Sequence, residues 1–541
     1  MMSRILLAVV ALVLGVSASP AHAPEGFNVT VDLGYTLHQG FLNKTGDFYT
    51  FSNIRFAEPP VGERRFKPPV PVSTDQRFKP PVSVLTAHRT VNDGSVGIAC
   101  PQSMPEWILA KAAKEQDGSA SAMHQMFEVD QEQDEDCLFL DVMVPRKIYE
   151  RRPGGMDEDS GQYGKAGFSP KSRAPVVVWI FGGGYVFGQK RMVGSEIDNP
   201  AGLIARSHDN GGEGVVYVAI NYRLGLYGWL NAGDDQDVFP NVALQDQRVA
   251  LEWVKKHIHH FGGDPDNVTV LGESAGGGSI MHHITAEGGK AKVPFKRAII
   301  QSPGFQTVVD APGIWKRTLS TASKLAGHKI QNGADLAALD PETLSKVNNR
   351  VVAESPDGTY TFGPTVDGGY VADLPGVLLL EGKFDQSPDL MMGHNANEAL
   401  VYLEPGITKT KLYKTEHERG VLFMSELSFT CNTRYLSTAW GNKTWNYRFQ
   451  VPPGAHGQDL SYTFYSGPNN RTDGKLAEDM QRYFANFARS GNPNVGGTLP
   501  DWPVYGESAR LATFGPEGIG TDVDKTRNER CAYWQTGKYR L

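Results

Sequence analysis

Residues 267–276 read Asn267-Val268-Thr269-Val270-Leu271-Gly272-Glu273-Ser274-Ala275-Gly276. The first five form a short apolar run typical of a buried strand, and the residues after Ser274 have a helical pattern. Gly272 and Gly276 flank the serine in a Gly-x-Ser-x-Gly pattern, because only small residues fit where a strand turns sharply into a helix. Such a turn raises the serine hydroxyl above the sheet edge, at a helix start that favours negative charge. The stretch therefore predicts an α/β fold with Ser274 as a nucleophile, and an ordinary helix N-cap is the alternative.

Segments on both sides of this stretch alternate between strand and helix character. Continuous apolar, β-branched runs occur at 176–180 and 215–220, and residues 297–301 are expected to form a further strand. The segment 243–259 has the apolar spacing of a helix and is followed by Gly262-Gly263-Asp264-Pro265. Fully apolar strands separated by helices are typical of a parallel sheet that is covered on both faces. Because no linker-like break interrupts the chain, we expect one domain over residues 19–541.

A run of glycines, Gly182-Gly183-Gly184, directly follows the strand expected at 176–180. Parallel strands end at the same sheet edge, so the N–H groups of Gly183 and Gly184 are expected near Ser274. Together with the N–H of Ala275 they would form an oxyanion hole, in which each donor contributes about 3 kcal/mol. A flexible turn or a dinucleotide loop is the alternative, but the spacing does not follow the dinucleotide pattern.

Several separated motifs add to this reading. They lie at residues 57–62, 135–140, 221–225, 246–248, 261–265, 272–277, 486–488 and 491–494. In their content and order the chain resembles the type-B carboxylesterase/lipase family of α/β-hydrolases, which includes cholinesterases and fungal lipases. The resemblance implies the α/β-hydrolase fold, with a large, mostly parallel sheet between helices, and the hydrolysis of carboxylic esters.

The resemblance also implies the partners of Ser274, since the family orders its catalytic residues as serine, acid, histidine. The family's acid lies in an Asn-x-x-Glu segment after a glycine, which here makes it Glu398. The family's histidine precedes a glycine and an acidic residue, which here makes it His456. We expect His456 to be the base and Glu398 to orient it. Glu273 is expected to support His456, or else to be a simple acidic residue at a helix start.

Spacing alone does not single out His456 among the 14 histidines. The group His257, His259 and His260 is the main competitor. Its spacing is unlike that of a zinc site, and we interpret these residues as solvent-exposed. We expect neither a metal nor a cofactor.

The four cysteines form an even set, as an oxidising compartment permits. The family implies the pairs Cys100–Cys137 and Cys431–Cys531. The loop closed by the first pair contains Trp107, and it is either a lid, as in lipases of the family, or a plain surface excursion. Two departures stand out. Phe181 replaces the usual histidine or tyrosine before the glycines, and the position of Trp107 argues against cholinesterase activity.

The N-terminus has the pattern of a secretion signal. A positive start precedes an apolar run from Ile5 to Val16, which is too short to span a bilayer as a helix. We expect a signal peptide over residues 1–18 and a secreted protein without stable membrane insertion. N-glycosylation sequons begin at Asn28, Asn43, Asn267, Asn442 and Asn470.

The net charge of −7 over 541 residues argues against a nucleic-acid partner, which needs a concentrated basic face. The expected partner is a small-molecule or lipid ester. An acyltransferase or lactone-processing enzyme with the same three residues is the alternative, and a neuroligin-like recognition protein is a further one. Aromatic residues expected near the mouth of the site are Tyr185, Phe187, Phe305 and Tyr402. Acyl chain length and oligomeric state are not predicted.

Overall fold

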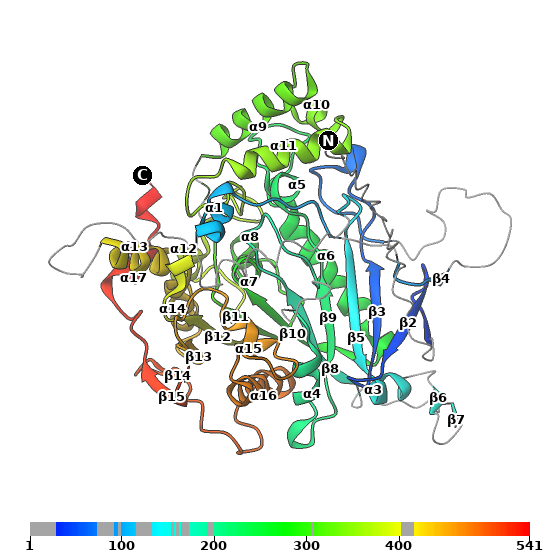
Figure 1. Ribbon diagram of the computed structural model, residues 1–541, viewed down its shortest axis with the longest axis vertical. Coiled ribbons are helices and arrows are strands. Elements are labelled where there is room, and N and C mark those ends of the chain that lie inside the picture. The colour runs from blue at the N-terminus through cyan, green and yellow to red at the C-terminus, as the bar shows by residue number, and fades with distance from the viewer. Residues whose placement is uncertain are drawn as a thin grey trace, which may run out of the picture.

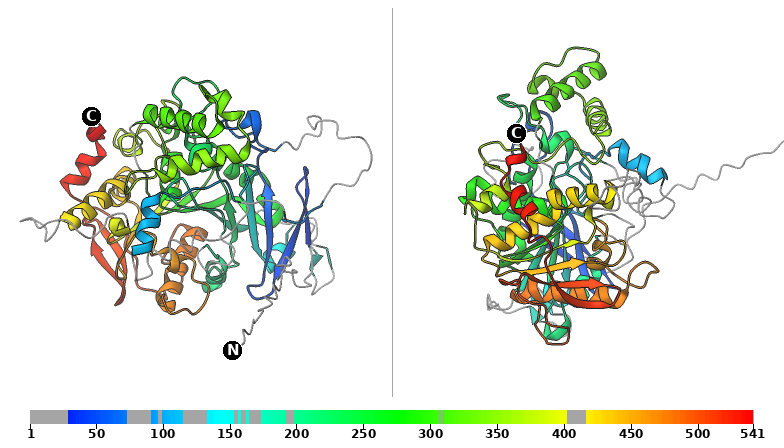
Figure 2. Two further views of the ribbon diagram at one scale, coloured as in Figure 1. Left: turned by 45° about the horizontal axis from the view of Figure 1, so that its top comes forward. Right: turned by 90° about the vertical axis from the view of Figure 1, so that its left-hand side faces the viewer.

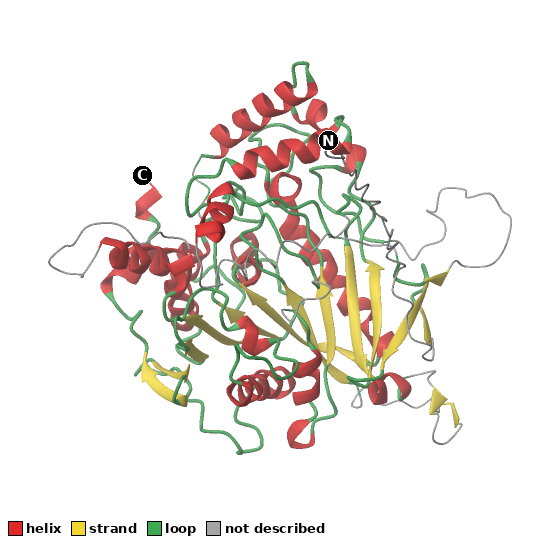
Figure 3. Ribbon diagram, in the orientation of Figure 1, coloured by secondary structure: helices red, strands yellow, loops and turns green. Residues whose placement is uncertain are grey.

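The computed structural model describes residues 29–72, 91–95, 99–114, 133–152, 156–157, 162–163, 173–191, 198–305, 308, 310–401 and 416–540. A 13-stranded sheet crosses the molecule in the order β1-β2-β3-β5-β9-β8-β10-β11-β12-β13-β14-β15, with β4 beside β2 (Figure 1). Helices surround this sheet (Figure 3). This is the α/β-hydrolase architecture that the sequence predicts.

The central strands are parallel. They are β9 (Val216–Ile220), β8 (Ala174–Ile180), β10 (Gly263–Glu273), β11 (Arg297–Gln301), β12 (Asp389–Asn395), β13 (Trp445–Phe449) and β14 (Arg510–Gly515). Antiparallel strands flank them: β1 (Val29–Asp32), β2 (Leu37–Asn43), β3 (Phe48–Arg55), β5 (Phe139–Pro145) and β15 (Gly518–Val523). The short β4 (Val91–Asn92) pairs with β2, and β6 (Met156–Asp157) pairs with β7 (Gln162–Tyr163).

Burial explains why these segments are strands. Every residue of β9 and β11 is buried, and successive side chains of a strand point to opposite faces. Both faces of the sheet are therefore covered, as expected for parallel strands. The registers pair Gly272 with Ile180 and Glu273 with Gln301, so the carboxyl ends of β8, β10 and β11 lie at one edge. That edge carries the site described below.

Helices follow most of the parallel strands. Their bounds are α1 (Glu106–Lys114), α3 (Arg146–Glu150), α4 (Ala201–Arg206), α5 (Gly225–Trp229), α6 (Val242–His257), α7 (Ala275–Ile284), α8 (Ala286–Gly289), α9 (Ala311–Ala326), α10 (Gly333–Ala337), α11 (Pro341–Ala353), α12 (Pro375–Leu380), α13 (Glu416–Ser425), α14 (Cys431–Ala439), α15 (Leu460–Thr463), α16 (Gly474–Ser490) and α17 (Glu529–Gln535). Five short 3₁₀ turns occur in the described residues, η1 (Gly62–Arg64), η4 (Asp209–Gly211), η5 (Ile258–Phe261), η6 (Glu398–Val401) and η8 (Lys538–Arg540), and η7 (Glu426–Thr430) is a π-helix.

Two helix pairs cover the central strands. Helices α6 and α7 pack together against β10, while α16 packs against α4 and against β8, β10 and β11. Helices α9 and α11 pack on each other, and with α10 they project beyond the sheet (Figure 2). The sequence did not predict this projecting group.

The helix expected at 243–259 is α6, which ends at His257 and continues as η5 to Phe261. Gly262, with a φ of 84°, ends it. The interpretation of the nearby histidines was wrong for His257, which is only 4% exposed. Its ring packs between Tyr35 and Trp253, and burial lowers its pKa to about 4. In the described part of the chain no group of three or more His, Cys, Asp or Glu side chains is arranged to hold a metal ion.

Two of the sequence motifs meet in a buried ion pair. Arg223, just after β9, donates from Nε and Nη2 to the carboxylate of Asp246 on α6, at 2.8 and 2.7 Å. The backbone N–H of Arg223 donates to the same carboxylate at 3.1 Å. Asp246 is 0% exposed and Arg223 2% exposed. The pair ties the end of β9 to α6, the helix that packs against β10, which lies two strands away in the sheet.

The disulfides Cys100–Cys137 and Cys431–Cys531 are both formed, which confirms the expected pairing. The second joins α14 to α17, 100 residues apart in the chain. In the loop of the first, Trp107 lies on α1 and donates from Nε1 to the carbonyl of Thr359 at 2.8 Å. Most of the remaining loop, residues 115–132, lies outside the described residues, so the lid stays a prediction.

Four of the five sequons lie in described residues. Asn43 and Asn470 are exposed, Asn442 is half-buried, and the half-buried Asn267 accepts a hydrogen bond from Arg297 at 2.5 Å. Asn28 and residues 1–18 lie outside the described residues. Among those described, none of the helices combines the length and apolarity needed to cross a bilayer.

Candidate active site

Ser274 stands at the turn between β10 and α7. Its φ of 54° and ψ of −120° are strained for a non-glycine residue. Hydrogen bonds hold this backbone: Ser274 donates its N–H to the carbonyl of Gln301, and its own carbonyl accepts from Gly278 and Gly304. The side chain makes no hydrogen bond as a helix cap, which leaves the N-cap alternative without support.

The flanking glycines are required by close backbone approach. A Cβ on Gly276 would lie 1.9 Å from the carbonyl oxygen of Ile180, and one on Gly272 would lie 2.7 Å from the backbone of Gly276. Either contact would push β8 or the first turn of α7 away. The glycines therefore let the serine turn pack directly against the end of β8.

Ser274, His456 and Glu398 form one hydrogen-bonded chain. Nε2 of His456 lies 2.8 Å from Oγ of Ser274, and Nδ1 lies 2.6 Å from Oε2 of Glu398. A proton on Nδ1 donates to the carboxylate, which leaves Nε2 free to accept the serine proton. The three residues follow β10, β13 and β12, which are near neighbours in the sheet. The structure thus brings together the three residues that the sequence nominates.

Three residues that the sequence did not nominate hold Glu398. Its Oε1 accepts from the Ser302 hydroxyl at 2.7 Å and from the Asn395 N–H at 2.6 Å. The Asn395 amide donates onward to Ser302 at 3.2 Å and to Asp459 at 3.1 Å. All four are fully or almost fully buried. Ser302 directly follows the strand expected at 297–301. Its position at the same sheet edge as Ser274 was therefore the signal by which the sequence could have nominated it.

Glu273 lies on the other side of the imidazole. Its Oε1 is 3.3 Å from Nε2 of His456, and its side chain is 4% exposed. Burial raises the pKa of Glu273 above its usual range. Burial alone would lower the pKa of His456, but the nearby carboxylates of Glu273 and Glu398 outweigh it and raise that pKa. The site therefore stabilises a positive charge on His456.

This arrangement predicts an effect of Glu273→Gln on the pH dependence of ester hydrolysis. A histidine base accepts a proton only when its Nε2 is unprotonated, so with His456 as the expected base activity should appear as the pH rises through its raised pKa. Loss of one carboxylate lowers that pKa, and the acid limb of kcat/KM should move down by about one pH unit. A pH–rate profile of kcat/KM measures this shift. Glu342→Gln, at an exposed position on α11, is the control. An unmoved acid limb would contradict the electrostatic role.

The glycine run after β8 lies against the serine turn. A Cβ on Gly182 would meet Ser274 Cβ at 3.0 Å, and Gly183 and Gly184 have φ values of 107° and 57°. Within the described residues nothing accepts a hydrogen bond from the N–H of Gly183, Gly184 or Ala275. Gly184 and Ala275 line one cavity together with Ser274, and backbone donors near the nucleophile are what an oxyanion hole needs. The Phe181 side chain has no polar group, and its ring stacks on that of Tyr222 with centroids 4.3 Å apart.

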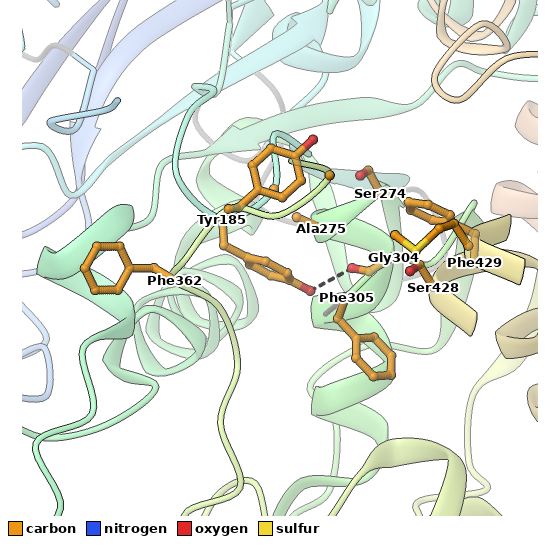
Figure 4. A pocket seen from close by; sticks show the side chains of 12 residues that line it. Tyr185, Ser274, Ala275, Gly304, Phe305, Phe362, Ser428 and Phe429 are labelled. Carbon is orange, nitrogen blue, oxygen red and sulfur yellow. Dashed lines mark hydrogen bonds between the residues drawn. The ribbon is translucent and has the colours of Figure 1, made fainter. Parts of the chain in front are cut away.

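A cavity opens at Ser274. Its lining consists of Gly184, Tyr185, Ser274, Ala275, Gly304, Phe305, Gly358, Tyr360, Phe362, Met424, Ser428 and Phe429 (Figure 4). Two of the aromatic residues expected at the mouth, Tyr185 and Phe305, are among them. Phe187 packs against Tyr360, with ring centroids 5.9 Å apart, and does not itself line the cavity. Tyr402 lies outside the described residues.

The fold and the site define an α/β-hydrolase with a buried serine, histidine and glutamate. The model of the carboxylesterase family matches residues 30–422 and 407–534. The chain belongs to this family, and it is a carboxylic ester hydrolase.

The similar proteins are named as carboxylesterases and lipases, in agreement with this family. The carboxylesterase patB of Aspergillus clavatus is 35% identical, over 96% of this chain and 97% of its own length. The carboxylesterase patB of Penicillium expansum is also 35% identical, over 93% of this chain and 95% of its own length. A secreted lipase of Arthroderma benhamiae is 30% identical, over 69% of this chain and 76% of its own length. Among solved structures, Aspergillus niger EstA superposes with a TM-score of 0.72 at 22% identity, covering 95% of this chain and 99% of that one, which shows the shared fold.

Proposed function

We propose that the protein hydrolyses carboxylic esters with Ser274 as nucleophile, His456 as general base and acid, and Glu398 as the residue that orients His456. The observation that carries this proposal is the chain of hydrogen bonds from Ser274 through His456 to Glu398, at 2.8 and 2.6 Å. Distances in this range allow proton transfer without rearrangement. The strained backbone of Ser274 adds support, since strain of this kind gathers at functional sites.

The first half of the reaction forms an acyl-enzyme. Ser274 Oγ attacks the carbonyl carbon of the ester, and its proton passes to His456 Nε2. The carbonyl oxygen becomes an oxyanion, which the N–H groups of Gly183, Gly184 and Ala275 stabilise. The bond to the alkoxy oxygen then breaks, and His456 gives its proton to the departing alcohol. Glu398 stabilises the imidazolium throughout.

The second half repeats these steps with water. His456 takes a proton from the water while the water oxygen attacks the acyl carbon. The bond to Ser274 breaks, Oγ regains the proton from His456, and the carboxylic acid leaves.

Labelling with a fluorophosphonate tests the assignment. The reagent bonds only to a serine whose proton is removed by a neighbouring base. We expect mass spectrometry to locate the label on the peptide containing Ser274, and we expect His456→Ala to abolish labelling. His328→Ala, at an exposed position after α9, should label normally. A label on another serine, or full labelling of His456→Ala, would overturn the assignment.

We further propose that the protein is secreted. The apolar run near the N-terminus, the sequons and the two disulfides support this, as does the similarity to a lipase described as secreted. N-terminal sequencing of protein from the culture medium should find Ser19 first. Protein that stays in the cells with its first residues intact would contradict secretion.

A further inference from the structure

The cavity at Ser274 has few polar side chains in its walls (Figure 4). The described residues that line it are aromatic residues, glycines, an alanine, a methionine and two serines, and none of these side chains is charged. In mostly apolar ligand sites, a small number of well-placed polar groups fixes the orientation of the ligand and supplies the specificity. The hydroxyl groups of this lining are therefore the groups that can distinguish one ester from another.

Most of these hydroxyl-bearing side chains already have partners within the protein. Ser274 Oγ lies 2.8 Å from Nε2 of His456, and the Tyr185 hydroxyl donates to the carbonyl of Gly304 at 2.9 Å. Tyr360 also interacts with neighbouring side chains. These residues are engaged before any substrate enters the cavity.

Ser428 differs from them. It is 7% exposed and lines the cavity, but its hydroxyl has no hydrogen-bond partner among the residues that the structure describes. A hydroxyl carries one donor proton and two acceptor lone pairs. Buried polar groups normally have a partner from protein, water or ligand, because an unpaired one is costly. The Ser428 hydroxyl is thus available to a group that enters the cavity.

The backbone of Ser428 is held in place relative to the nucleophile. Its carbonyl accepts a hydrogen bond from Nδ2 of Asn432 at 3.0 Å, and the same amide donates to the carbonyl of Pro303 at 2.9 Å. The next residue, Gly304, donates its N–H to the carbonyl of Ser274 at 2.8 Å. These bonds link Ser428 to the serine turn, so its hydroxyl has a defined place beside the reacting atoms.

Ser428 and its neighbour Phe429 both belong to the π-helix η7. Single π-helical turns are rare and occur frequently at functional sites. Both residues line the cavity, and Figure 4 shows their side chains on the same side of it. The irregular turn therefore offers one apolar and one polar contact to the same space.

On the basis of the proposed function, we propose that Ser428 is a specificity-determining residue that donates a hydrogen bond to an uncharged oxygen of the substrate. The substrate class is an ester with a second oxygen function, such as an ether, keto or hydroxyl group, in the part that occupies the cavity. A carboxylate would fit less well, because none of the described residues that line the cavity carries a charge to pair with it.

Pairs of esters that differ only by the exchange of a methylene for an ether oxygen test this proposal. The pairs are p-nitrophenyl methoxyacetate with butyrate, p-nitrophenyl 3-methoxypropionate with valerate, and 2-methoxyethyl acetate with butyl acetate. They place the oxygen on either side of the ester bond. The readout is the ratio of kcat/KM for the ether to that for its methylene partner. Intrinsic reactivity is the same for every variant, so it cancels when these ratios are compared.

In Ser428→Ala we expect this ratio to fall about 5- to 10-fold below the wild-type ratio for at least one pair, since a neutral hydrogen bond contributes about this factor. Ser490→Ala, at the end of α16, removes the same atom outside the site and should keep all the wild-type ratios. A role of Ser428 in structure alone would lower kcat/KM for both esters of a pair alike and would leave the ratio unmoved.

The outcomes separate the two proposals. Unchanged ratios in Ser428→Ala for every pair, or an equal fall in Ser490→Ala, would overturn the inference about Ser428. Neither result touches the assignment of Ser274. Hydrolysis that survives Ser274→Ala would overturn the proposed function instead.

Discussion

Ser274→Ala will lower kcat for p-nitrophenyl acetate by about 10⁶-fold, because it removes the hydroxyl that lies 2.8 Å from Nε2 of His456. Binding and the backbone donors at Gly183, Gly184 and Ala275 remain in the variant. They should leave a residual rate about 10³- to 10⁴-fold above that of water alone. Burst and steady-state kinetics measure both quantities.

Two further variants make this result specific. Ser490→Ala, at the end of α16, exchanges the same atoms outside the site and should keep the wild-type rate. The double variant Ser274→Ala, His456→Ala should be no slower than Ser274→Ala, because the residues act as one unit. A further loss of 10-fold or more in the double variant would show that His456 contributes independently of Ser274.

Asp246→Ala should have the largest effect on stability. It removes the carboxylate that neutralises Arg223 and leaves a positive charge buried at 2% exposure. Breaking a buried pair from one side costs about 3–5 kcal/mol in the free energy of unfolding. Urea unfolding followed by fluorescence measures this cost.

The control lies on the same helix. Glu252 pairs with Arg248 at 2.8 Å, but its side chain is 53% exposed, so Glu252→Ala should change the free energy of unfolding by less than about 1 kcal/mol. Replacing both partners, Arg223→Met with Asp246→Leu, should recover part of the stability lost in Asp246→Ala, since no lone charge is then buried. A double variant that is less stable than Asp246→Ala would contradict this explanation.

The electrostatics of the site explain how one chain keeps a reactive histidine buried. Glu398 and Glu273 flank the imidazole at 2.6 and 3.3 Å, and together they make up for the water that burial removes. Asn395, Ser302 and Asp459 hold Glu398 in one orientation. Because Glu398 is fully enclosed, its charge acts in a medium of low dielectric constant and not in water.

The strands and the serine turn were predictable because their signals are local. A run of buried β-branched residues needs no distant partner to be recognised, and Gly272 and Gly276 are required by the turn itself. The same holds for the glycines after β8, whose place at the sheet edge follows from the parallel order of the strands. Glu398 and His456 lie 124 and 182 residues beyond Ser274, so only the family resemblance could nominate them.

By itself, then, the sequence predicted the α/β fold and the turn that presents Ser274, and the family resemblance nominated Glu398 and His456 as its partners. Only the tertiary structure decided that His257 is buried, that Ser302 and Asn395 hold Glu398, and which residues line the cavity at Ser274. The physical reason is the distance along the chain over which each signal acts. Strand and turn signals arise between neighbours in the chain, whereas burial and the lining of a cavity arise where residues from distant segments, such as Tyr185, Tyr360 and Phe429, come together.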